Sequence, residues 1–155
     1  MIEVGLPAPD FILMDTEKKK HSLSDYLGKK AVLAFFPGAF TGGCTKELCT
    51  LRDSMSEFNS MDVNVLAISV DSIFANKAFR DQNKLSFPLL SDFKKEVIEK
   101  YGVVFVGLGG MEGYVSAQRA VFFVDGDGRI SYKWIADSPG VEPFYADLKK
   151  ALAYV

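Results

Sequence analysis

One apolar run constrains this chain more than any other feature: Ala31-Val-Leu-Ala-Phe-Phe36, followed at once by the loop Pro37-Gly-Ala-Phe-Thr-Gly-Gly-Cys44. A run without polar alternation is typical of a strand that is buried on both faces. After the loop, apolar residues recur at helical intervals: Leu48, Leu51, Met55 and Phe58. Strand, short loop and helix in this order predict an α/β fold whose loop lies at the carboxyl end of a core strand.

The rest of the chain continues this alternation. Strands are expected at 31–36, 62–70, 87–90, 119–124 and 129–135, and helices at 44–60, 72–83, 91–101 and 141–154. Asp71 or Ser72 would cap the second helix, and Asp125-Gly-Asp-Gly128 would turn a hairpin between the last two strands. Residues 103–118 are rich in glycine without a clear period, and we expect a loop there. The order predicts one domain, 1–155, in which a mixed β-sheet has helices on both faces.

Composition excludes several classes of function. Eighteen basic side chains against twenty acidic ones leave a formal charge of −2, which gives no support for a nucleic acid or an anionic membrane as partner. The first residues have no cationic segment leading into a long apolar stretch, and no apolar window reaches membrane-spanning length, so we expect no secretory signal and a cytoplasmic location. Two cysteines and one histidine are too few for a four-ligand zinc site, and we expect neither a metal nor a cofactor.

Cys44 is the candidate reactive group, because the loop delivers it to the start of the predicted helix. The first amides of a helix lack intrahelical partners, and the positive end of the helix dipole lies there. Both favour the thiolate over the thiol, whose ordinary pKa is about 8.5. The sequence therefore predicts a sulfur prepared for nucleophilic attack.

The chain resembles the peroxiredoxins, which are thioredoxin-fold thiol peroxidases. The resemblance rests on Pro37, Thr41 and Cys44 in the spacing P-x-x-x-T-x-x-C, with Arg119 at the start of a late strand. Segments 5–11, 86–92 and 119–128 also resemble family segments in the same order. Cys44-Thr-Lys-Glu-Leu-Cys49 is similar to the bacterioferritin comigratory protein or peroxiredoxin Q group, and Phe40-Thr-Gly-Gly to the alkyl hydroperoxide reductase E-like group.

This resemblance implies a thioredoxin-like fold and the reduction of hydrogen peroxide or alkyl hydroperoxides by the thiolate of Cys44. It implies that Arg119 binds the sulfur and the peroxide, and that Thr41 offers its hydroxyl to either. Pro37 would shape the loop and shield the sulfur from water, and Glu47 would orient Arg119. Two further residues are expected to line the substrate pocket: Phe40 and Gly43.

Cys49 is the candidate for the second half of the cycle, in which a thiol condenses with the sulfenic acid of Cys44. Five residues of helix rise about 7.5 Å, whereas a disulfide needs Cα atoms within about 7 Å of each other. The helix would have to unwind in part if Cys49 resolves Cys44. Otherwise Cys49 is a packed core residue and an external thiol resolves the sulfenic acid. A thioredoxin-like protein or another thiol would then restore the enzyme.

Two other functions compete with this interpretation. A thioredoxin-like disulfide reductase needs C-x-x-C at the start of the helix, but Thr41 stands where the first of those cysteines would be. A redox-sensing or chaperone-like interaction module could use the same cysteine as a switch. A monomer and a homodimer are both compatible with the sequence.

Overall fold

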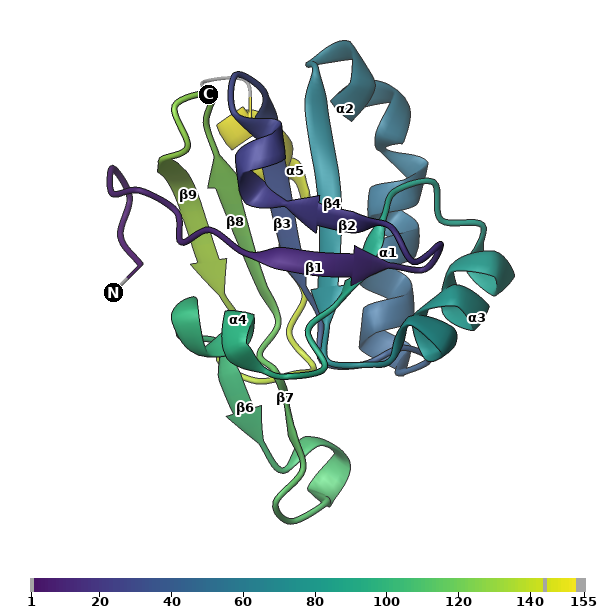
Figure 1. The fold of residues 1–155 in the computed structure, drawn as a ribbon. Coiled ribbons are helices and arrows are strands. Elements are labelled where there is room, and N and C mark those ends of the chain that lie inside the picture. Colours follow the sequence, from purple (N-terminus) through teal and green to yellow (C-terminus); the bar gives the residue numbers. More distant parts are fainter. Residues whose placement is uncertain (1, 144, 153–155) are drawn as a thin grey trace.

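The computed structural model describes residues 2–143 and 145–152, and the side chains of Gly43 and Cys44 also lie outside the description. Phe144 and Tyr154, within the helix predicted at the C-terminus, are among the residues left out. In the described chain, seven strands form one sheet in the order β2-β1-β5-β4-β3-β8-β9 (Figure 1). Their bounds are Ile12–Asp15 (β1), Lys20–Ser22 (β2), Lys30–Phe35 (β3), Val63–Ser69 (β4), Leu89–Ser91 (β5), Ala120–Val124 (β8) and Ile130–Ile135 (β9).

The helices and a second, two-stranded sheet complete the described structure. The α-helices are Gly42–Asp53 (α1), Met55–Ser60 (α2), Ile73–Asn83 (α3), Glu96–Lys100 (α4) and Tyr145–Leu152 (α5). Two 3₁₀ turns are Leu23–Tyr26 (η1) and Leu108–Gly110 (η2), and the small sheet pairs Val104–Val106 (β6) with Val115–Ala117 (β7). In the described chain, no helix is both long enough and apolar enough to cross a bilayer.

The predicted mixed sheet with helices on both faces is confirmed. β3 runs parallel to β4 and antiparallel to β8, so Leu33 pairs with Leu66 on one side and with Phe122 on the other. Side chains alternate across the strand. Leu33 packs with residues of α4, whereas its neighbour Val32 belongs to the core formed with α1, α2, α3 and α5. The run of residues 31–36 is apolar throughout because both faces of β3 are covered.

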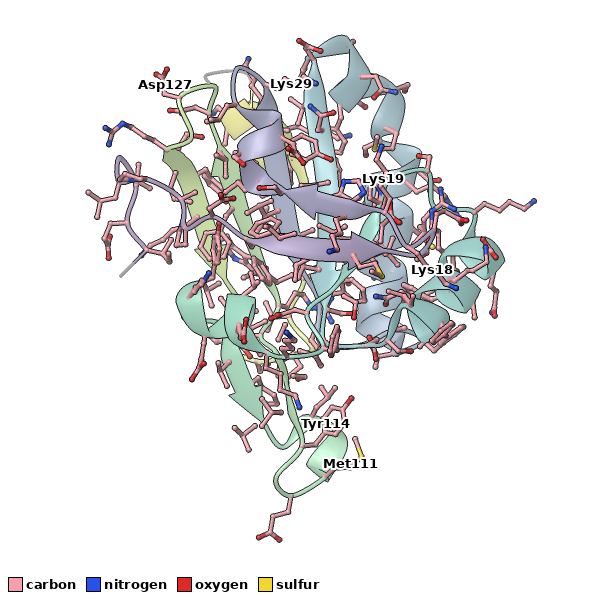
Figure 2. The ribbon with its side chains drawn as sticks, viewed as in Figure 1. Lys18, Lys19, Lys29, Met111, Tyr114 and Asp127 are labelled. Carbon is pink, nitrogen blue, oxygen red and sulfur yellow. The ribbon has the colours of Figure 1, made fainter. Side chains whose placement is uncertain are left out.

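The structure corrects several predicted elements. Residues 103–118 are not simply a loop, since β6 and β7 form an antiparallel hairpin that projects from the sheet (Figure 1). Met111 and Tyr114 lie toward its far end (Figure 2). The strands have three residues each, too few for a recognisable period, and Gly107 turns the chain at a φ of 94°. The hairpin of β1 and β2 was also not predicted, for the same reason of length.

Helix boundaries differ from prediction as well. The helix expected at 44–60 is interrupted at Ser54, whose φ of −96° and ψ of 2° separate α1 from α2. The helix expected at 91–101 shrinks to α4, because Ser91 still belongs to β5 and Lys95 adopts a left-handed φ of 64°. The carboxylate of Asp92 accepts hydrogen bonds from the amides of Val97 and Ile98 near the start of this helix.

Candidate active site

The loop between β3 and α1 carries the predicted motif. Pro37 and Gly38 are buried directly after the strand, and Thr41 is the N-cap residue of α1. The Thr41 hydroxyl does not cap the helix. It donates to the carbonyl oxygen of Gly38 at 2.9 Å, which also accepts the Thr41 amide at 3.4 Å. The loop is therefore closed on itself just before the helix begins.

This geometry makes Cys44 the third residue of α1. At that position the backbone amide is among those that no intrahelical carbonyl satisfies, and the helix dipole is positive. Since the cap hydroxyl bonds to Gly38 instead, it does not compete for these amides. The side chain of Cys44 lies outside the described residues, as does the pocket role predicted for Gly43. The backbone alone places Cys44 where a thiolate is favoured.

Arg119 directly precedes β8 and is 1% exposed. The register pairs Ala120 with Phe35, so Arg119 lies one position further along, beside the start of the motif loop. Its Nε and Nη2 donate to the carbonyl oxygen of Pro139 at 3.1 and 2.9 Å, and its Nη1 donates to Oε2 of Glu47 at 3.2 Å. A buried guanidinium costs much less when it is paired in this way.

Glu47 lies on α1, three residues after Cys44, and positions three apart share a face of a helix. Its side chain is fully buried, and burial raises the pKa of Glu47 to about 7 even though Arg119 opposes the shift. Its Oε1 atom has no hydrogen-bond partner among the described residues. The structure therefore brings Glu47 and Arg119 together, and their contact lies on the same side of α1 as position 44.

Phe40 protrudes from the loop in an unusual backbone conformation. Its φ is 66°, a left-handed value that costs a bulky residue free energy. The side chain is 50% exposed, and its ring lies edge-on to the buried ring of Phe79 on α3, with centroids 5.2 Å apart. A Cβ built on Gly38 would lie 3.8 Å from Cδ2 of Leu108, so the β6–β7 hairpin also reaches this loop. Sequence reasoning missed Leu108, because it was assigned to a featureless loop.

Cys49 is half-buried on the side of α1 that faces α3. Its Sγ donates to Oδ1 of Asn83 at 3.5 Å, and Arg52 donates from Nη1 to the carbonyl oxygen of Asn83 at 2.5 Å. Cys44 and Cys49 thus belong to one unbroken helix, five positions apart. Their Cα atoms are separated by about 7.5 Å of helical rise, beyond ordinary disulfide geometry.

Across residues 2–143 and 145–152, no three His, Cys, Asp or Glu side chains are grouped in a way that could hold a metal ion. The chemistry available at this end of the sheet comes from a helix N-terminus, a buried guanidinium and a hydroxyl. Together these groups can stabilise negative charge on a sulfur and on an oxygen that departs from the atom the sulfur attacks.

Comparison with known proteins gives consistent results. The AhpC/TSA family model matches residues 4–133 of the chain. A relative from Coxiella burnetii that is named as a bcp peroxiredoxin is 42% identical over 133 residues, 86% of this chain and 88% of that protein. Peroxiredoxin Bcp of Bacillus subtilis is 35% identical over 133 residues, 86% of this chain and 85% of the relative. The crystal structure of Peroxidoxin BcpB from Mycobacterium tuberculosis matches with a TM-score of 0.82 at 31% identity, covering 99% of this chain and 96% of that one.

Proposed function

The chain belongs to the AhpC/TSA family and is a peroxiredoxin, a thiol-dependent peroxidase, and from this premise we propose that Cys44 is the sulfur that attacks the peroxide. The observation that carries the assignment is the buried contact of 3.2 Å between Arg119 and Glu47. It fixes a permanent positive charge beside the helix whose first turn holds Cys44. An arginine remains charged at any physiological pH, so this cation is always present.

The first step is a displacement at oxygen. The thiolate of Cys44 attacks one oxygen of ROOH, where R is hydrogen or an alkyl group. A sulfur–oxygen bond forms, the oxygen–oxygen bond breaks, and its electron pair leaves on RO⁻, which takes a proton to become ROH. The sulfur is oxidised to sulfenic acid and the peroxide is reduced. Arg119 and the first amides of α1 would stabilise the charge on the departing oxygen.

Thr41 takes a more specific role than its residue type alone suggests. Its hydroxyl proton is already donated to the carbonyl of Gly38, so the lone pairs of its oxygen remain available. We propose that Thr41 accepts a hydrogen bond from the O–H of the bound peroxide and thereby orients the oxygen–oxygen bond. Pro37 is buried beneath the loop, which fits the proposed exclusion of water. The half-exposed ring of Phe40 would line the entry for the substrate.

Cys49 is the proposed resolving thiol. Its sulfur condenses with the sulfenic acid of Cys44, forming a disulfide and releasing water. A dithiol reductant of the thioredoxin type would then exchange with this disulfide and leave oxidised. Because α1 is intact between the two cysteines, the step requires local unwinding of the helix. Reduction of this kind needs a compartment rich in thiols, and we propose the cytoplasm.

The test is thiol counting by mass spectrometry after one equivalent of peroxide, on the wild type and on Cys44→Ser and Cys49→Ser. The proposal expects an intramolecular disulfide in the wild type and no oxidation in Cys44→Ser. Cys49→Ser should be oxidised as fast as the wild type and should retain a sulfenic acid. Rapid peroxide consumption by Cys44→Ser would refute the assignment of Cys44. A sulfenic acid or a mixed disulfide persisting in the wild type would instead assign resolution to an external thiol.

A further inference from the structure

The loop of residues 37–41 is tied to the segment between β4 and α3 through a carboxylate that the proposed reaction does not use. The amide of Ala39 donates to Oδ2 of Asp71 at 2.8 Å, across 32 positions of the chain. Pro37 has no amide proton, and the amide and hydroxyl of Thr41 both turn back to Gly38. Among the described residues, the bond to Asp71 is thus the hydrogen bond that joins this loop to the segment following β4.

Asp71 is itself fixed by buried polar side chains. Ser69 and Ser91 are register partners at the carboxyl ends of β4 and β5, and both are almost fully buried. The Asp71 amide donates to the Ser69 hydroxyl at 3.2 Å, and the Ser91 hydroxyl donates to the Asp71 carbonyl at 2.6 Å. The Ser69 hydroxyl in turn donates to Oδ1 of Asn76, which is also buried. The two bonds to its main chain hold Asp71 in place, although Nδ2 of Asn76 has no hydrogen-bond partner among the described residues.

Capping of α3 does not account for the Asp71 side chain. Asp71 and Ser72 are both compatible with the cap by residue type, and the structure shows that the Ser72 hydroxyl accepts a hydrogen bond from the amide of Ala75 at 3.1 Å. The carboxylate of Asp71 points instead at the motif loop, where its Oδ2 lies 4.0 Å from a Cβ built on Gly38. A hydrogen bond from a neutral amide to a carboxylate is stronger than one between neutral groups.

We propose that Asp71 is a positioning residue for peroxide reduction, acting through Ala39 on the loop that presents Thr41; this inference rests on the proposed function. By holding the amide of Ala39, Asp71 fixes the carbonyl of Gly38, and that carbonyl determines where the Thr41 hydroxyl points. Loss of the anchor lets the loop shift relative to the N-terminus of α1. Misplacement by about 1 Å costs a reaction that depends on orientation roughly 100-fold in rate.

Three variants test the proposal: Asp71→Ala, Asp71→Asn and Ser72→Ala. Asp71→Ala removes the acceptor, whereas the side-chain oxygen of Asp71→Asn still accepts the Ala39 amide. Ser72→Ala is the matched control, because it removes the neighbouring helix cap and leaves the loop bond intact. The measurements are the rate constant for oxidation by hydrogen peroxide, the exchange rate of the Ala39 amide by nuclear magnetic resonance, and the midpoint of thermal unfolding.

We expect Asp71→Ala to react about 10- to 100-fold more slowly, with faster exchange at Ala39. Asp71→Asn should recover most of the rate, and Ser72→Ala should lower the unfolding midpoint without slowing oxidation. Wild-type rate in Asp71→Ala, or an equal loss of rate in Ser72→Ala, would overturn the proposal. If the wild type itself does not react with peroxide, the proposed function fails. The exchange rate at Ala39 then decides the positioning role, and unchanged exchange in Asp71→Ala rejects it.

Discussion

The Nη1 atom of Arg119 lies 3.2 Å from Oε2 of Glu47, and the two side chains are 2% and 0% exposed. The pair joins the start of β8 to the first two turns of α1, although 72 positions separate the residues in the chain. Charge-assisted hydrogen bonds of this type specify geometry, because a buried ion that loses its partner is strongly destabilised. The contact therefore fixes the position of the guanidinium. It also makes the free energy of unfolding depend on the protonation of Glu47.

Replacing Glu47 with glutamine should remove a pH dependence of stability. Burial raises the pKa of Glu47 from its ordinary 4.5 to about 7. Between these two pH values the folded protein therefore keeps a proton on Glu47 that the unfolded chain has lost. Its contribution to the free energy of unfolding is fully present below pH 4.5 and is lost as pH rises through 7. Each unit between the folded and unfolded pKa is worth about 1.4 kcal/mol. Glu47→Gln should lack this decline.

Urea unfolding of the wild type and Glu47→Gln between pH 4 and pH 8 measures the effect, and Glu57→Gln is the control. Glu57 is half-exposed and pairs with Lys149 at 3.1 Å on the surface, so its removal should change stability little at any pH. If the free energies of unfolding of the wild type and Glu47→Gln change with pH in the same way over this range, the interpretation is wrong.

Replacing Arg119 with lysine keeps the charge but loses the planar fork. Arg119 uses three nitrogens at once, two toward the carbonyl of Pro139 and one toward Glu47. A single ammonium cannot reproduce this arrangement and still face the peroxide. We expect Arg119→Lys to lower the rate constant for peroxide about 100-fold or more, in line with the loss of one preorganised donor.

The control for Arg119→Lys is Arg129→Lys, because Arg129 is exposed and donates to the carbonyl of Gly5. Stopped-flow oxidation of both variants, each shown to be folded by circular dichroism, makes the comparison. Equal rates for Arg119→Lys and the wild type would show that charge alone suffices.

Sequence reasoning succeeded where the signal is local or belongs to a family motif. The apolar run of β3 and the hairpin of β8 and β9 are confirmed, as are the family and the thioredoxin-like fold. It failed for β1, β2, β6 and β7, which have three or four residues each and draw their pairing from partners elsewhere in the chain. Strands this short show no recognisable alternation of apolar and polar residues.

The site residues also fall into those that the sequence could identify and those that only the fold reveals. Pro37, Thr41, Cys44 and Arg119 were identified through their spacing and the family resemblance, and their roles stay predictions. The carbonyl of Pro139 could not have been found, because every residue type carries a main-chain acceptor. Similarly, an aspartate beside a helix start is equally compatible with a cap, so only the fold distinguishes Asp71 from Ser72.

Phe40 should respond differently to glycine and to alanine. Both substitutions remove the exposed ring and its contact with Phe79, but only glycine tolerates a φ of 66° without strain. Phe40→Gly should therefore be more stable than Phe40→Ala by about 1 kcal/mol. If the ring lines the substrate entry, both variants should lose activity toward cumene hydroperoxide and keep activity toward hydrogen peroxide.

Thermal unfolding and steady-state assays with the two peroxides test both expectations for Phe40. Phe74 on α3 is 70% exposed, so Phe74→Ala controls for the loss of a surface aromatic ring. Equal stability of the glycine and alanine variants would contradict the strain. A parallel loss of both activities would contradict the pocket role.

In the wild type, we expect Arg52 to slow the resolving step, because its hydrogen bond to Asn83 holds α1 against the end of α3. Its Nη1 donates to the carbonyl of Asn83, the residue whose side chain accepts the Cys49 thiol, and both contacts favour the folded helix. Arg52→Ala should leave the oxidation of Cys44 unchanged and accelerate disulfide formation several-fold, since about 1 kcal/mol less is needed to unwind the helix. Rapid-quench mass spectrometry resolves the two steps, and Arg80→Ala, on the adjacent helix, is the control. A slower second step in Arg52→Ala would show that the helix is not the barrier and that Arg52 assists the reaction of Cys49 directly.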